Sequence, residues 1–190
     1  MNETIKIIMT RRSIRKYQPE QISRDELQTI LEAGTFAPSA MNQQPWHFTV
    51  IQNRELFQKL NEACKTALVK TNNKSFAERT RGISLENFNI FHHAPTLIIV
   101  SGDEQAIAPQ NDCSLALENM FLAAESLGIG SCWMHAIKLF YATDDGKTFL
   151  HQELQIPEGY TPVGSGVFGY KAGESPAAPA RKTGTITIFD

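Results

Sequence analysis

The strongest constraint on the fold is a helix, predicted over residues 111–127, that is apolar almost all the way round. A helix on a protein surface shows a single apolar stripe, whereas this helix has to be buried on several sides. Gly128 follows it at the position where helices commonly end. In a chain of this size, we expect part of the helix to be buried in a subunit interface. Its apolar side chains are Leu115, Ala116, Leu117, Met120, Phe121, Leu122, Ala123, Ala124 and Leu127.

The length and composition of the chain fit one soluble domain. Its 190 residues can build a hydrophobic core, and 42% apolar with 20% charged residues is ordinary for a globular protein. A net charge of −2 gives no electrostatic reason to bind nucleic acid or an acidic membrane. Cys64, Cys113 and Cys132 are widely spaced and fit no metal-binding pattern, so we expect free thiols and no metal site. Residues 5–9 are too short an apolar run for a signal peptide or membrane span, which predicts a cytoplasmic protein.

Periodicity and turn residues predict the remaining elements. Ser23 and Glu26 have the spacing of a capping box, which marks the start of one helix. Residues 70–89 are polar and weakly patterned, so we interpret them as a mobile excursion with short helices. Helices are expected over residues 3–9, 24–36, 54–70 and 111–127, and strands over residues 48–51, 96–100, 130–136, 164–169 and 185–189.

The strand at residues 164–169 also fits the glycine pattern of dinucleotide-binding proteins. That pattern works only in a strand–turn–helix unit with more of a βαβ fold to follow. Few residues follow here, and Pro176 and Pro179 interrupt them. We therefore interpret the pattern as a strand that contains glycines.

Residues 11–17, Arg-Arg-Ser-Ile-Arg-Lys-Tyr, are a local basic segment on a mildly acidic protein. The planar guanidinium group matches the geometry of a phosphate, and a serine hydroxyl can add a short hydrogen bond. If the segment is rigid, it is an anion clamp; if it is flexible, it is a solvated basic patch. The seven residues alone fit both interpretations.

Residues 37–48, Ala-Pro-Ser-Ala-Met-Asn-Gln-Gln-Pro-Trp-His-Phe, are predicted to form a fixed loop that leads into a strand. Pro38 and Pro45 bracket small and amide residues, which favours a loop over a helix. Carboxamides such as Asn42 offer both donors and acceptors, which suits the pyrimidine edge of a heterocycle. The alternative is an ordinary polar surface loop.

These two motifs, at this spacing, strongly resemble the FMN-dependent nitroreductase family, and the resemblance covers most of the chain. It implies an α+β fold with a central, mostly antiparallel sheet flanked by helices. Residues 1–190 would then be a single FMN-binding domain. The resemblance also implies a homodimer with FMN at the subunit interface, in which residues 175–190 form an arm that reaches the partner and exchanges the C-terminal strand.

The resemblance assigns cofactor contacts to four segments, which are residues 11–15, 38–42, 134–135 and 181–182. The first would grip the FMN phosphate and ribityl chain, with its last arginine near N1 and O2 of the flavin ring. The second would line the cofactor from the partner subunit and bond the pyrimidine edge through its asparagine. The third would offer a backbone N–H to flavin N5, and the fourth would close on the phosphate. The residues are, in that order, Arg11, Arg12, Ser13 and Arg15; Pro38, Ser39, Ala40 and Asn42; Met134 and His135; Arg181 and Lys182.

The third segment departs from the family pattern. Many members carry an acidic residue and a glycine where this chain has His135 and Ala136. A main-chain donor to N5 is compatible with this change. For the His135 side chain, both a functional role and an ordinary position at the end of a strand remain open.

The sequence contains no evident Ser/His/Asp set or close carboxylate pair, which fits a protein whose cofactor carries the chemistry. The resemblance implies that NAD(P)H reduces bound FMN, which then reduces a nitroaromatic, quinone or similar small oxidised substrate by a ping-pong route. The alternatives are other flavin chemistry on the same fold (dehalogenation, ring oxidation or flavin breakdown) and a flavin-binding redox sensor without turnover. A basic interaction domain that binds no flavin is the third alternative.

Overall fold

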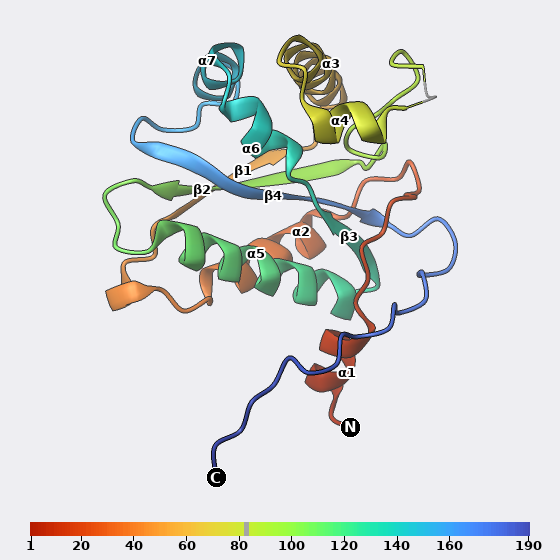
Figure 1. Cartoon of the computed structure of the whole chain (residues 1–190), viewed down its shortest axis with the longest axis vertical. Helices are drawn as coiled ribbons and strands as arrows, with labels where there is room; N and C mark the ends of the chain where they lie inside the picture. Colours follow the sequence, from red (N-terminus) through yellow and green to blue (C-terminus); the bar gives the residue numbers. More distant parts are fainter. Residues whose placement is uncertain (82–83) are drawn as a thin grey trace.

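The computed structural model describes residues 1–81 and 84–190, and its body has three layers, with a four-stranded sheet between two layers of helices (Figure 1). The strand order is β1-β2-β4-β3, and each neighbouring pair is antiparallel. This arrangement confirms the predicted α+β fold. The strands are β1 (Trp46–Ile51), β2 (Thr96–Asp103), β3 (Ile129–Trp133) and β4 (Tyr160–Tyr170).

Two long helices, α2 (Arg24–Thr35) and α5 (Pro109–Ser126), cover one face of the sheet (Figure 1). The predicted capping box is confirmed at the start of α2, where Glu26 N donates to Ser23 Oγ at 3.2 Å and Ser23 N donates to Glu26 Oε2 at 2.8 Å. Gly128 follows α5 with a φ of 76°, as expected for a helix end. Leu115 on α5 is 46% exposed, so one chain leaves part of this apolar helix uncovered.

Four further helices cover the opposite face, and their apolar side chains share a core with the sheet. They are α3 (Arg54–Lys70), α4 (Lys74–Arg79), α6 (Ala136–Tyr141) and α7 (Asp144–Gln152). α3 confirms the helix predicted over residues 54–70, and α4 is a short helix within the predicted excursion over 70–89. Residues 82–83 of that excursion lie outside the described residues. α6 and α7 were not predicted.

The strand predicted over residues 130–136 is wrong at its C-terminal end. β3 stops at Trp133, and Met134 N donates to Ser165 O at 2.7 Å as the chain turns out of the sheet. His135 then takes a helical conformation as the N-cap of α6. The other strands are longer than predicted, since β1 begins at Trp46, β2 continues to Asp103 and β4 spans Tyr160–Tyr170.

The two ends of the chain lie outside the layers. α1 (Glu3–Thr10) confirms the short helix predicted at residues 3–9, and the C-terminal arm runs away from the body (Figure 1). Residues 185–189, which we expected to form a strand, belong to no strand within one chain, and Phe189 is 93% exposed. Pairing of this arm with a partner's sheet stays a prediction. None of the helices in the described ranges is long and apolar enough to cross a membrane.

Candidate functional site

The basic segment is fixed along the edge of the sheet at β3. Ser13 forms a parallel bridge with Ser131, and Ile14 N donates to Ser131 O at 2.9 Å. The Ile14 side chain is buried, and Tyr17 Oη donates to Ile14 O at 2.6 Å. The segment therefore has the rigidity that an anion clamp requires, which a solvated basic patch would lack.

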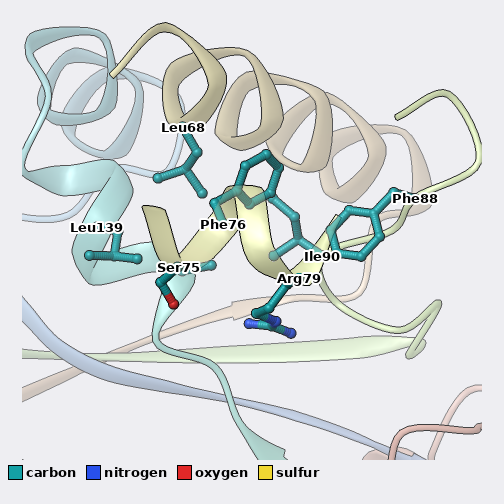
Figure 2. A pocket seen from close by; sticks show the side chains of 8 residues that line it. Leu68, Ser75, Phe76, Arg79, Phe88, Ile90 and Leu139 are labelled. Atoms are coloured by element: carbon teal, nitrogen blue, oxygen red, sulfur yellow. The ribbon is translucent and has the colours of Figure 1, made fainter. Parts of the chain in front are cut away.

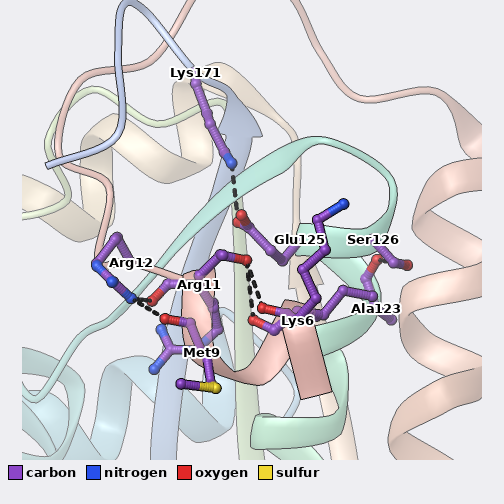
Figure 3. Close-up of polar contacts among 10 residues, drawn as sticks. Lys6, Met9, Arg11, Arg12, Ala123, Glu125, Ser126 and Lys171 are labelled. Carbon is purple, nitrogen blue, oxygen red and sulfur yellow. Dashed lines mark hydrogen bonds and ion pairs between the residues drawn. The ribbon is translucent and has the colours of Figure 1, made fainter. Parts of the chain in front are cut away.

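Two of its arginines have partners within the chain. Arg11 Nε lies 3.4 Å from Glu118 Oε1, and its guanidinium group lies over the ring of Phe121 at 5.7 Å. Arg12 Nη1 donates to Met9 O at 2.8 Å and to Arg11 O at 2.7 Å, so this side chain caps the end of α1 (Figure 3). Arg12 Nε is buried and makes no hydrogen bond within the part of the chain that the structure describes.

The third arginine, Arg15, and Arg79 at the end of α4 both act through their charges on His92 and Cys132, and we call these two arginines the cationic cluster. Arg15 is exposed, and its one hydrogen bond among the described residues is a long one, from Nη1 to Ser13 O at 3.5 Å. Figure 2 shows the Arg79 guanidinium group on the sheet side of α4. Neither arginine forms an ion pair with a carboxylate in residues 1–81 and 84–190. Two such cations near one another favour an anionic or electron-rich ligand.

The charges of this cluster affect the pKa values of two nearby side chains, His92 and Cys132. Burial, with the nearby charges of Arg79 and Arg15, lowers the pKa of His92 to about 4, so the imidazole is neutral at pH 7. Its Nε2 is buried without a hydrogen-bond partner in the described structure. Burial raises the pKa of the Cys132 thiol, and the charge of Arg15 opposes this rise. Cys132 is therefore a neutral thiol beneath the cluster.

The turn after β3 is held by Ser165 on β4. Met134 N donates to Ser165 O, and Ser165 Oγ donates to Met134 O, both at 2.7 Å. Met134 is buried, and its N–H is already used, so it cannot donate to a cofactor. The first N–H groups of a helix have no partner within the helix. The groups at the start of α6 that could donate are therefore those of His135, which is exposed, and Ala136.

The indole of Trp133 lies flat against β4 beside this turn. A Cβ atom added to Gly164 would come within 2.4 Å of Trp133 Cη2, so the close approach depends on the absence of a side chain there. The indole is 38% exposed and borders the start of α6. It gives the site an aromatic wall.

A small apolar cavity lies behind Arg79, between α3, α4 and α6 (Figure 2). Phe76 and Phe88 pack edge to face on one side of it, with ring centroids 5.8 Å apart. Its volume of about 20 Å³ leaves room for about one water molecule. This cavity is part of the packing beneath the cationic cluster and is too small for an organic substrate.

The loop predicted to contact the flavin edge lies at the opposite edge of the sheet. It contains η1 (Ala40–Asn42), a single turn of 3₁₀ helix, and leads directly into β1. Pro38 and Asn42 are exposed, Ser39 and Ala40 are half-buried, and Asn42 Oδ1 accepts from Gln44 Nε2 at 3.0 Å. β1 and β3 are the two outer strands of the sheet, so about 14 Å separates them at the usual strand spacing. One chain therefore does not bring the two motifs together.

The second basic pair is not built into the fold of one chain in the way that residues 11–15 are. Arg181 and Lys182 are exposed in the C-terminal arm, in no helix or strand. Neither forms an ion pair within the described ranges. Of the four segments expected to contact the cofactor, the structure brings together residues 11–15 and 133–136 and places the loop at residues 38–42 at the opposite edge of the sheet.

Sequence reasoning missed three residues that shape the site. Arg79 lies in a weakly patterned stretch, so its proximity to Arg15 could not be read from the sequence. His92 carries no motif that would single it out; no group of three or more His, Cys, Asp or Glu residues that could hold a metal occurs in the described ranges. Ser165 lies within the glycine pattern of residues 164–169, which gives no indication that its side chain bonds to the turn after β3.

The fixed basic segment, the cationic cluster and the N–H groups at the start of α6 give this α+β protein one sheet edge that is rich in hydrogen-bond donors and positive charge. A sequence profile of the nitroreductase family matches residues 8–170. A putative NADH dehydrogenase/NAD(P)H nitroreductase of Archaeoglobus fulgidus is 37% identical over 179 residues, which cover 92% of this chain and 88% of the relative. The chain therefore belongs to the nitroreductase family.

Solved structures agree with this assignment. The crystal structure of a nitroreductase with bound FMN from Bacteroides fragilis matches with a TM-score of 0.90 and 41% identity, over 100% of both chains. A second nitroreductase with bound FMN, from Desulfitobacterium hafniense, matches with a TM-score of 0.86 and 31% identity over 100% of both chains. Among the relatives with assigned activity, an FMN reductase [NAD(P)H] of Bacillus subtilis is 29% identical over 94% of this chain and 70% of its own length.

Proposed function

We propose that this protein is an FMN-dependent oxidoreductase that takes electrons from NAD(P)H and passes them to a small oxidised acceptor such as a nitroaromatic or a quinone. The observation that carries the proposal is the fixed placement of residues 11–15 along β3, next to the start of α6. The named activities of the relatives and the FMN bound by the solved nitroreductases support it.

The polar groups at this edge fit FMN. Arg12 Nε and His92 Nε2 are buried without partners in the described structure, and Arg15 and Arg79 have no carboxylate beside them. A phosphate near Ser13 and the remaining donors of Arg12 would match the charge and hydrogen-bond needs of the segment. Arg181 and Lys182 would close on the same phosphate from the arm.

When bound, FMN supplies hydride transfer at N5, and the protein binds, orients and tunes it. Arg15 and Arg79 place positive charge where the pyrimidine edge would lie, which stabilises negative charge on that edge. The N–H of His135 or of Ala136 would donate to N5, and Ser165 holds the turn that presents both groups. Trp133 limits the access of water on one side.

We propose a homodimer because one chain separates the two motifs at opposite edges of its sheet. A second copy would bring its η1 loop, with Pro38, Ser39, Ala40 and Asn42, to the β3 edge of the first. An apolar groove of about 350 Å³ between α1, α2 and α5 is available for such contact, and its neighbour Phe36 is 78% exposed. The arm at residues 175–190 would extend onto the partner.

Dehalogenation is a second candidate reaction. An iodotyrosine deiodinase of Thermotoga neapolitana is 27% identical over 64% of this chain. The same cofactor site would serve both reactions, so the choice depends on the acceptor bound above the flavin. Anaerobic turnover with nitroaromatic, quinone and iodotyrosine acceptors, compared under the same conditions, separates the two candidates.

The first experiment is a visible absorption spectrum of the purified protein, repeated anaerobically after addition of NADH or NADPH. We expect flavin bands that bleach with at least one of the two donors. Flavin bands that persist with both would instead indicate a flavin-binding sensor without turnover. A colourless protein that binds no added FMN would contradict the proposal and favour an interaction domain.

A further inference from the structure

Asp112, in the first turn of α5, is a buried carboxylate far from the cationic cluster. It is 4% exposed, and its Oδ2 accepts a hydrogen bond from Ala40 N at 3.1 Å. No lysine or arginine pairs with it in residues 1–81 and 84–190. The N-terminal end of a helix favours a negative charge, which lowers the cost of burying this group. A carboxylate placed here at such a cost indicates a specific task.

The loop that Asp112 contacts has a strained backbone. Met41, Asn42 and Gln44 have φ values of 51°, 54° and 48°, in the left-handed region that non-glycine residues rarely adopt. Asn42 tolerates this region, but for Met41 and Gln44 it costs on the order of 1 kcal/mol each or more, so the loop conformation persists only when surrounding contacts fix it. The loop therefore needs anchors outside itself.

Most of the loop's hydrogen bonds are internal. Gln44 N donates to Ser39 Oγ at 3.0 Å and Asn42 N donates to Ser39 O at 3.0 Å, which shapes the loop without attaching it to the fold. Attachment comes from the Ala40–Asp112 bond and from an exposed bond between Ile107 N and Gln43 Oε1 at 2.9 Å.

A third attachment lies at the start of β1, where Asp103 N donates to Pro45 O at 2.9 Å. It fixes the end of the loop rather than η1. The Asp112 bond is therefore the buried anchor of η1 itself.

We propose that Asp112 is a positioning residue of the cofactor site. By holding Ala40 N–H, it sets Ser39 and Asn42 in the conformation that meets the flavin. This inference rests on the proposed function, in which the loop of one subunit lines the FMN held at the β3 edge of the other. Asp112 then acts on a cofactor bound mainly by the partner subunit, through a loop and without touching it.

The test compares Asp112→Ala and Asp112→Leu, which remove the acceptor, with Asp112→Asn, which keeps one. Asp112→Leu also keeps most of the buried volume, so it separates a lost hydrogen bond from a cavity. Thr143→Ala is the control in the opposite layer, because it removes a bond from a backbone N–H to a side-chain oxygen, from Gly146 N to Thr143 Oγ1 at 3.0 Å, together with the bond from Thr143 Oγ1 to Phe140 O at 2.7 Å. For each full-length protein, we would measure the Kd for FMN, the bound-flavin spectrum and the Tm without FMN.

We expect Asp112→Ala and Asp112→Leu to weaken FMN binding about ten- to thirty-fold, since a lost buried hydrogen bond is worth roughly that factor. We expect Asp112→Asn to recover affinity to within about threefold of the wild type. Thr143→Ala should lower the Tm and leave both the Kd and the flavin spectrum unchanged.

Two results would overturn the inference. One is a lowered Tm with unchanged FMN affinity in Asp112→Leu, which would make the residue merely structural. The other is an Asp112→Asn protein that folds and binds FMN as weakly as Asp112→Leu. A wild-type protein that binds no FMN would instead refute the proposed function, and the inference with it.

Discussion

Residues 11–15 and residues 181–182 are both basic segments that the resemblance to the nitroreductase family would place at the same phosphate, yet they differ in how one chain holds them. The first is bridged to β3 through Ser13 and Ser131, and two of its arginines bond to α1 and α5. The second lies in an exposed arm without secondary structure. One half of the proposed clamp is therefore built by the fold of a single chain, while the other half depends on a partner or on the ligand.

The difference separates two kinds of contribution to binding. A group that is already ordered loses little conformational entropy when a ligand arrives, whereas a mobile arm has to be ordered at that moment. Residues 11–15 should therefore set the intrinsic affinity for the anion. Residues 181–182 should add affinity only in proportion to how well the arm is ordered by dimerisation.

The largest loss of FMN affinity is expected from removal of residues 175–190. We expect the truncated protein to keep its fold, because the arm is exposed, but to be a monomer and to bind FMN about 100-fold more weakly or worse. Light scattering and FMN titration measure the two properties. The double substitution Arg181→Ala and Lys182→Ala in the full-length chain separates the lost charges from the lost strand. A truncated monomer with unchanged FMN affinity would show that one chain holds the whole site.

A smaller effect is expected from Arg12→Ala in the ordered segment. The substitution removes the hydrogen bonds to Met9 O and Arg11 O and should destabilise the FMN-free protein by about 1–2 kcal/mol. FMN affinity should fall about tenfold as well, because the segment would lose both a phosphate donor and its rigidity.

Thermal unfolding without FMN and FMN titration give the two values for Arg12→Ala. Arg181→Ala, whose side chain is exposed, is the control that should leave the unfolding temperature unchanged. Equal losses of stability in Arg12→Ala and Arg181→Ala would show that residues 11–15 are no more firmly held by the fold than the C-terminal arm is.

The smallest effect is expected from pH, and it reports the cluster beside Arg15. Burial lowers the pKa of His92 to about 4, so the unfolded chain binds a proton near pH 6.5 that the folded chain binds only near pH 4. His92 thus contributes stability above pH 6.5 that is lost as pH falls from 6.5 towards 4. His92→Asn keeps a residue type that tolerates the φ of 57° at this position.

We expect His92→Asn to flatten the dependence of Tm on pH between 6.5 and 4. Arg181→Ala, in the arm, should leave the same dependence unchanged. A wild-type protein whose Tm is constant across this range, after correction for its other groups, would contradict the buried neutral imidazole.

Local sequence signals predicted the elements whose causes are local. The Ser23–Glu26 capping box fixed the start of α2, and Gly128 marked the end of the helix that proved to be α5. The end of β3 could not be predicted in this way. The apolar run through residues 132–134 continues a strand pattern, whereas the structure ends β3 at Trp133, and the contacts that hold the following turn come from Ser165, more than thirty residues away.

The residues of the candidate site also fall into those that a local motif predicts and those that only long-range contacts place. The two motifs in residues 11–17 and 37–48 are contiguous, so the resemblance to a family could assign roles within them. Asp112 bonds to a residue more than seventy positions away, and Arg79 acts on His92 from a stretch without clear periodicity, so neither contact leaves a spacing rule in the sequence. The placement of the two motifs at opposite edges likewise follows from strand order, which periodicity does not reveal.

The strand order β1-β2-β4-β3 also has a kinetic consequence. No two neighbouring strands form a hairpin, since each pair joins residues more than thirty positions apart, and folding should be slow for a chain of this length. β3 and β4 have the shortest separation, so we expect the unit from β3 to β4 to nucleate the sheet. The Ser13–Ser131 bridge spans more than one hundred residues, so the basic segment should dock late in refolding. Refolding followed by amide exchange should therefore protect the amide of Met134, which bonds to Ser165 on β4, before it protects that of Ile14.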